Sequence, residues 1–286
     1  VKFGPSPIQN EPKPFLMWSE EFIAPPTPLS EDCLSLNVWS GARTSADRLP
    51  VFIWIHGGAF ISGAASCAIY DGKAMAREGI VFVSINYRLG VMGFMAHPEL
   101  TKESTAASSG NYGLMDQIAA IQWVKNNIAA FGGDPGKVTI GGQSAGSMSV
   151  QALVASPLTK GMIHGAIAES GGANRPMMSL KSAEEIGERI AAMAHVTSIS
   201  DLRALPADSV LKIANKIPFG SFAPIADGHV LPDDVKTIVH DKKQNDIPLL
   251  AGWVTGDGAL AGGAPLNAAA YTQQTSKVFG KHSAAI

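Results

Sequence analysis

The chain has 286 residues, and its 22 Lys and Arg against 24 Asp and Glu give a formal net charge of −2, which argues against a nucleic-acid partner. Apolar residues make up 46% of the chain, enough for a sizeable core, and no apolar run approaches the ~18 residues that span a bilayer. The two cysteines exclude a disulfide scaffold and do not group with histidines, so we expect no metal and no membrane span.

Proline dominates the first 30 residues of the chain. Because proline removes a backbone donor and disfavours helix, we expect residues 1–30 to form an irregular surface segment. Phe15 and Trp18 are its expected aromatic anchors.

From residue 34 onward, short apolar runs alternate with helical patterns. The predicted strands cover residues 34–39, 51–55, 80–85, 138–140, 166–168 and 248–251. The predicted helices cover residues 71–78, 113–130, 145–155, 182–194 and 207–214. The alternation predicts an α/β fold in which helices cover both faces of a mostly parallel sheet.

A serine lies between glycines in the turn from the predicted strand 138–140 to the predicted helix 145–155. Gly142 and Gly146 stand two residues before and two after Ser144, as a tight turn that exposes a serine hydroxyl requires. The helix that follows directs free N–H groups at developing negative charge. The pattern predicts that Ser144 is a catalytic nucleophile; the alternative is a glycine-rich loop without chemistry.

A second glycine-rich loop, residues 56–60, directly follows the predicted strand 51–55. Small residues let backbone N–H groups approach a substrate oxygen and stabilise the oxyanion of a tetrahedral intermediate. We interpret His56 as a brace of this loop and not as a catalytic base, because it lies inside the loop. The expected donors are the N–H groups of Gly58, Ala59 and Ala145, with Gly57 in support.

Further motifs occur in order along the chain, at residues 30–39 (SEDCLSLNVW), 54–60 (WIHGGAF), 86–88 (NYR), 110–117 (GNYGLMDQ), 122–124 (QWV) and 131–135 (FGGDP). With them the chain resembles the type B carboxylesterase family, which includes cholinesterases and bacterial para-nitrobenzyl esterases. The resemblance is dense from residue 30 to 172 and thinner from 222 to 258. It implies the α/β-hydrolase fold and ester hydrolysis by a Ser–acid–His triad, without a metal or an organic cofactor.

The chain departs from the family pattern at a few positions. The family commonly has Glu where this chain has Gln143, which should weaken any preference for cationic substrates, and a third glycine where Ala59 still donates an N–H. The family disulfide often joins the cysteine matching Cys33 to an upstream cysteine that this chain lacks. Cys33 and Cys67 are therefore either reduced thiols or bridged to each other.

The resemblance places the triad acid after a late strand, where Asp257 stands in the position of the family's Glu. Asp can orient a histidine as Glu does, although Gly-Asp-Gly is also a good turn sequence. Asp227, which matches a structural position of the family, is the second choice. The base follows the acid in this fold; only His282 does so, and its surroundings do not match the family's histidine loop. We therefore expect the catalytic histidine downstream of this chain.

We expect residues 1–286 to form a single partial α/β-hydrolase domain, incomplete at both ends. Its parts are the lead-in at 1–30, a nucleophile-bearing core at 31–175, and a helical region with the acid-bearing strand at 176–286. The predicted function is hydrolysis of a small-molecule carboxylic ester through an acyl-serine, with little or no activity from this chain alone. The alternatives are a non-catalytic cholinesterase-like binding or adhesion domain, and a lipase or other acyl-transfer enzyme on the same fold.

Overall fold

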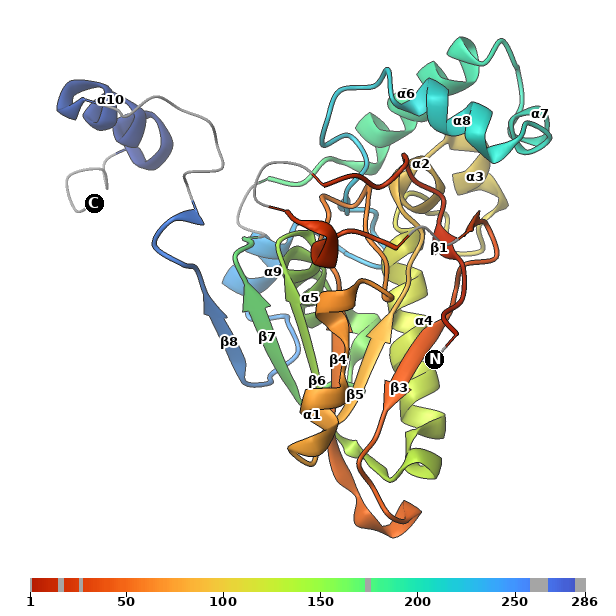
Figure 1. The fold of residues 1–286 in the computed structure, drawn as a ribbon. Coiled ribbons are helices and arrows are strands. Elements are labelled where there is room, and N and C mark those ends of the chain that lie inside the picture. Colours follow the sequence, from red (N-terminus) through yellow and green to blue (C-terminus); the bar gives the residue numbers. More distant parts are fainter. Residues whose placement is uncertain (1, 15–17, 26–27, 173–175, 258–266, 281–286) are drawn as a thin grey trace. The chain divides into compact units, whose positions relative to one another are not determined.

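The computed structural model describes all of the chain except residues 1, 15–17, 26–27, 173–175, 258–266 and 281–286. The chain divides into two compact units, Val1–Gly252 and Trp253–Ile286. Within the described part of the first unit, six strands form the main sheet in the order β3-β5-β4-β6-β7-β8 (Figure 1). These strands are β3 (Leu36–Trp39), β4 (Leu49–Ile55), β5 (Val81–Ile85), β6 (Gly133–Gln143), β7 (Gly165–Glu169) and β8 (Leu249–Gly252).

The sheet is mostly parallel, which confirms the predicted fold class. Only the β3–β5 pair is antiparallel among these strands. Strands β4 and β6 are parallel neighbours, and their last paired residues are Ile55 and Gly142. The loops that follow these two strands therefore leave the sheet side by side at its carboxyl edge.

Helices cover both faces of the sheet (Figure 1). The α-helices of the first unit are α1 (Lys73–Arg77), α2 (Gly90–Phe94), α3 (Pro98–Glu103), α4 (Tyr112–Asn127), α5 (Ala145–Ala155), α6 (Leu180–Met193), α7 (Ile199–Arg203), α8 (Ala207–Ala214) and α9 (Val235–His240). The 3-10 turns are η1 (Glu20–Phe22), η2 (Ser45–Asp47), η3 (Ala68–Tyr70), η4 (Ile128–Phe131) and η5 (Pro157–Thr159). Helices α4, α5 and α9 pack on one face, whereas α1 lies on the other.

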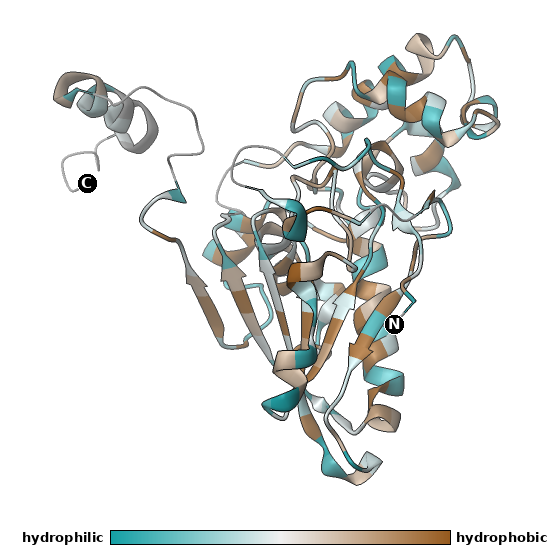
Figure 2. Cartoon of the chain, in the orientation of Figure 1, coloured by the Kyte–Doolittle hydropathy of each residue, from teal (hydrophilic) through white to brown (hydrophobic). Residues whose placement is uncertain are grey.

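The two faces of β4 are built from different side chains. Val51, Ile53 and Ile55 are fully buried in the aliphatic core, as the apolar run predicts. Phe52 and Trp54 point to the opposite face, where the Trp54 ring lies 5.6 Å from the ring of Tyr70. Figure 2 shows the apolar colour concentrated along the central strands. The buried face anchors the end of the strand, Ile55, directly before the loop that follows it, whereas Phe52 and Trp54 on the other face are half-buried.

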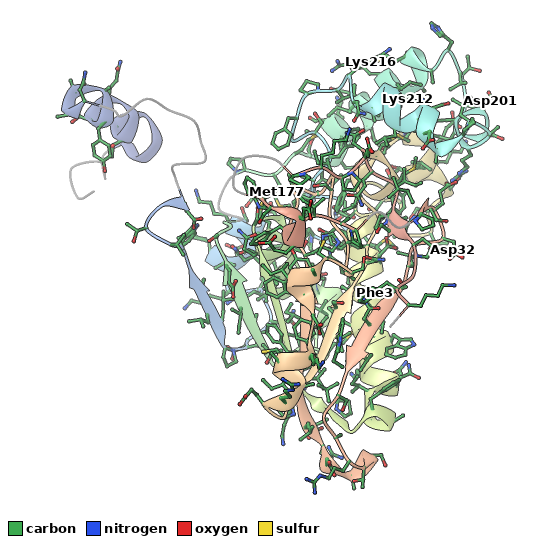
Figure 3. The ribbon with its side chains drawn as sticks, viewed as in Figure 1. Phe3, Asp32, Met177, Asp201, Lys212 and Lys216 are labelled. Carbon is green, nitrogen blue, oxygen red and sulfur yellow. The ribbon has the colours of Figure 1, made fainter. Side chains whose placement is uncertain are left out.

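Helices α6, α7 and α8 lie beyond the carboxyl ends of the parallel strands (Figure 1). Asp201 on α7, Lys212 on α8 and Lys216 just after α8 are exposed (Figure 3). Val210 and Ala214 on α8 are buried instead. This amphipathic pattern attaches the helical region to the rest of the first unit through its apolar side.

The structure corrects the length of one predicted strand. Strand β6 covers Gly133–Gln143 and not only residues 138–140. Its pairing with β4 shifts register around Asp134, whose carboxylate accepts the N–H of Gly136. The glycines and the proline of residues 133–136 therefore mark an irregularity inside a longer strand and not a turn before a short one.

The proline-rich lead-in packs more tightly than expected. Ser6 and Gln9 are buried, and the two-residue strands β1 (Ser6–Pro7) and β2 (Leu29–Ser30) pair in parallel. Trp18 is half-buried, and Phe15 lies outside the described residues. Long-range pairing, which local sequence does not reveal, orders this segment.

Cys33 and Cys67 are both buried free thiols, which answers the question that the sequence left open. Burial raises the pKa of each thiol to about 11. Both therefore pack as small apolar groups and stay protonated at neutral pH.

The second unit, Trp253–Ile286, contains helix α10 (Ala268–Phe279). The Asn267 side chain caps this helix by accepting the N–H of Ala270 at 2.9 Å.

Candidate active site

Ser144 occupies a strained turn between β6 and α5. Its φ and ψ are 58° and −120°, a conformation that non-glycine residues rarely adopt. Its N–H donates to the carbonyl of Glu169, and its own carbonyl accepts the N–H of Met148. Backbone bonds on both sides therefore hold the half-buried serine at the carboxyl edge of the sheet.

The glycines around Ser144 are required by close backbone contacts. A Cβ atom on Gly142 would lie 2.6 Å from the carbonyl of Gly146 and 2.7 Å from the carbonyl oxygen of Ile55. A Cβ atom on Gly146 would collide with the same oxygen of Ile55. The spacing of the two glycines thus follows from the packing of the turn against the end of β4.

The loop after β4 lies directly against this turn. A Cβ atom on Gly57 would stand 2.6 Å from the carbonyl oxygen of Gln143 and 3.3 Å from Cβ of Ser144. The structure therefore brings the predicted nucleophile and the predicted oxyanion loop together.

Two peptide groups of the loop are oriented through their carbonyls. The carbonyl of Gly57 accepts from Nδ1 of His56 at 2.8 Å. The carbonyl of Gly58 accepts the N–H groups of Ile61 and Ser62 and the hydroxyl of Ser62, at 3.0, 3.0 and 3.1 Å. In a planar trans peptide the N–H points opposite to the C=O. The N–H groups that follow, those of Gly58 and Ala59, are therefore turned away from these bonds.

These N–H groups are available to a ligand. Within the described part of the chain, the backbone N–H groups of Gly58, Ala59 and Ala145 donate no hydrogen bond. Ala145 is the first residue of α5, where a helix leaves its N–H unpaired. Ala59 and Phe60 have φ of 54° and 62°, so the loop, like the serine turn, is held in a strained conformation.

His56 is fully buried, and its ring stacks on Tyr87 with the centroids 4.5 Å apart. Burial lowers the pKa of His56 to about 4, so the imidazole is neutral at pH 7. Because a carbonyl can only accept, Nδ1 carries the proton that bonds to Gly57. This geometry suits a brace of the loop, and a base protonated only near pH 4 is poorly matched to catalysis at pH 7.

Sequence reasoning did not assign a role to Tyr87. Its hydroxyl donates to the carbonyl of His56 at 2.8 Å, so one side chain holds both the ring and the backbone of that residue. The residues 86–88 stood out as a motif, but only the fold shows that β5 ends beside this loop.

The candidate acid Asp257 belongs to the second unit. Its carboxylate accepts the N–H of Val254 at 3.1 Å, and its own N–H donates to the carbonyl of Val254. The local structure is a tight turn, and the triad role of Asp257 stays a prediction. His282 lies outside the described residues.

Asp227, the second candidate, is buried and fully engaged. One carboxylate oxygen accepts the hydroxyl of Ser108 at 2.6 Å, and the other accepts the N–H groups of His229 and Leu231. These contacts support a structural use of Asp227 in fixing its own loop.

Two absences hold for the part of the chain that the structure describes. No three His, Cys, Asp or Glu side chains there group so as to hold a metal ion. No helix there is long and apolar enough to cross a bilayer.

A mostly parallel sheet with a strained serine turn between a strand and a helix defines an α/β-hydrolase fold. The Carboxylesterase family matches residues 1–284. The chain therefore belongs to the carboxylesterase family.

Individual relatives agree with this family. Fumonisin B1 esterase of Sphingopyxis macrogoltabida is 45% identical over 210 residues, which cover 71% of this chain and 38% of that protein. Para-nitrobenzyl esterase of Bacillus subtilis is 40% identical over 245 residues, covering 81% of this chain and 48% of that protein. A crystal structure of the Geobacillus stearothermophilus carboxylesterase EST55 matches with a TM-score of 0.80 and 34% identity, over 98% of this chain and 58% of that chain. This chain thus spans less than half the length of the two curated relatives.

Proposed function

We propose that the protein containing this chain is a serine carboxylic ester hydrolase that works through an acyl-serine intermediate. The observation that carries the proposal is Ser144 at φ 58° and ψ −120°, set against a loop in which the N–H groups of Gly58 and Ala59 have no partner among the described residues. The family match supports ester substrates as a class.

The first half of the reaction forms the acyl-enzyme. Ser144 Oγ bonds to the ester carbonyl carbon while a histidine outside this chain accepts the serine proton. The N–H groups of Gly58, Ala59 and Ala145 bind the oxyanion of the tetrahedral intermediate. The bond to the alkoxide then breaks, and the alcohol leaves with the proton from the histidine.

The second half releases the acid. Water gives a proton to the histidine and adds to the acyl carbon, and the tetrahedral intermediate collapses with the proton returned to Ser144 Oγ. In this proposal Asp257 orients the histidine and stays ionised. These 286 residues alone, without that histidine, are expected to show little or no turnover.

The test uses the protein translated from the complete reading frame that contains this chain, assayed on short-chain para-nitrophenyl esters. Ser144→Ala should lower kcat by a factor on the order of 10⁶, because the nucleophile is lost. Ser200→Ala, which alters an exposed serine on α7, is the matched control and should retain full activity. Turnover that survives Ser144→Ala would overturn the proposal.

A further inference from the structure

A buried carboxamide from the lead-in reaches the far end of the loop that carries the oxyanion donors. Gln9 is only 2% exposed. Its Oε1 accepts the N–H of Gly63 at 2.9 Å, and its Nε2 donates to the carbonyl of Gly63 at 2.9 Å and to that of Pro7 at 3.1 Å. One side chain thus satisfies both backbone groups of Gly63, across 54 positions in the sequence.

Gly63 in turn contacts the residues that orient the loop. Its φ is +112°, and a Cβ atom there would lie 2.5 Å from Nδ1 of His56 and 2.9 Å from the carbonyl oxygen of Gly57. These are the two atoms whose hydrogen bond turns the Gly58 N–H outward. Gly63 also directly follows Ser62, which bonds to the carbonyl of Gly58.

We propose that Gln9 is a positioning residue for the oxyanion hole, acting through Gly63 and His56. The inference rests on the proposed function, since it names what holds the donors of that site. Oxyanion donors act only within a narrow range of distances to the developing oxyanion, and small misplacements lower the rate strongly. β4 fixes the loop at its start, and Gln9 fixes it at Gly63, so residues 57–62 are held at both ends.

The neighbouring residue provides an internal control. Asn10 and Asn215 exchange a reciprocal amide pair, with N···O distances of 3.2 and 2.7 Å, and both side chains are exposed. Asn10 has the same chemistry and lies in the same segment, but its bonds go to the residue that ends α8. Removing its carboxamide should leave the loop unchanged.

The first experiment compares Gln9→Ala with Asn10→Ala in the protein from the complete reading frame. Gln9→Ala should lower kcat about 10- to 100-fold with KM nearly unchanged, because the donors bind the transition state more than the substrate. It should weaken a trifluoromethyl ketone inhibitor, which forms a tetrahedral adduct, by a similar factor. If Gln9 only stabilised the fold, Gln9→Ala would lower the melting temperature, and the affinity for the inhibitor would change no more than KM does. Equal kcat and inhibitor affinity in the two variants would overturn the proposal.

The second experiment needs no variant. Hydrogen exchange of the wild-type protein from the complete reading frame should show the Gly63 amide protected, since the buried side chain of Gln9 accepts it. Exchange at the rate of an exposed amide would overturn the proposal even if Gln9→Ala failed to fold. The outcomes distinguish the two claims. If the wild-type protein shows no turnover that depends on Ser144, the proposed function is wrong. If Gln9→Ala and Asn10→Ala have equal kcat and inhibitor affinity, only the positioning role of Gln9 is wrong.

Discussion

Helices α6, α7 and α9 begin at residues whose side chains cap them, whereas the loops after β4, β6 and β7 contain non-glycine residues at positive φ. Ser179, Ser198 and Asp234 each accept a backbone N–H in the first turn of their helix. In these three loops the residues at positive φ are Ala59, Phe60, Ser144 and Ser170.

The difference lies in the range of the forces that hold each region. A cap acts within about four residues and contributes about 1 kcal/mol. A strained loop persists only where the surrounding structure over-determines it. Around Ser144 that structure includes the carbonyls of Ile55 and Glu169, which come from strands on either side of β6.

The largest expected effect on stability comes from crowding the strained region. Gly146→Ala places a methyl group on the carbonyl oxygen of Ile55 and should cost about 3 kcal/mol, as overpacked interiors do. Gly252→Ala is the control, because nothing lies within 4 Å of its added methyl group. Urea denaturation measures both. Equal midpoints for the two variants would mean that the contact at Gly146 does not matter.

A smaller effect is the pH dependence that the buried His56 gives to the stability of the fold. The pKa of His56 is lowered from 6.5 to about 4, so between these values the unfolded chain binds more protons than the folded chain. Stability from this group is therefore present above pH 6.5 and is lost as the pH falls toward 4. Between pH 7 and pH 5 the loss is about 2 kcal/mol.

His56→Phe should remove this dependence while keeping a ring against Tyr87. His240→Ala, which removes an exposed histidine, should retain it. Thermal unfolding followed from pH 7 to pH 5 compares the two variants. A wild-type pH profile in His56→Phe would show that the buried imidazole is not its source.

The smallest expected effect on stability comes from removing the side chain that caps helix α9. Asp234→Ala removes the acceptor of the Thr237 N–H and should cost about 1 kcal/mol, whereas Asp234→Asn keeps an acceptor and should cost much less. Melting temperatures measure the difference. If the Asn variant lost as much as the Ala variant, the cap would not be the cause.

The same contrast explains what could be predicted from the sequence. Helices α5 and α8 coincide with the predicted ranges 145–155 and 207–214, because periodicity and breakers act locally. Strand β6 is longer than predicted because its first residues join the sheet only through pairing with β4, across a register shift that the local sequence does not reveal.

The site divides in the same way. Ser144 and the loop 56–60 stand out in the sequence because glycine spacing marks tight turns. The contribution of Gln9 was invisible, because its partner Gly63 is 54 residues away and neither residue carries a local signal.

Covalent labelling tests the central claim, that Ser144 is the nucleophile, most directly. The protein from the complete reading frame would be treated with a fluorophosphonate, digested, and mapped by mass spectrometry. We predict one adduct, on the peptide that contains Ser144, which is lost in Ser144→Ala and retained in Ser200→Ala. Ester turnover without an adduct on Ser144, or an adduct on another residue that accounts for inhibition, would contradict the account.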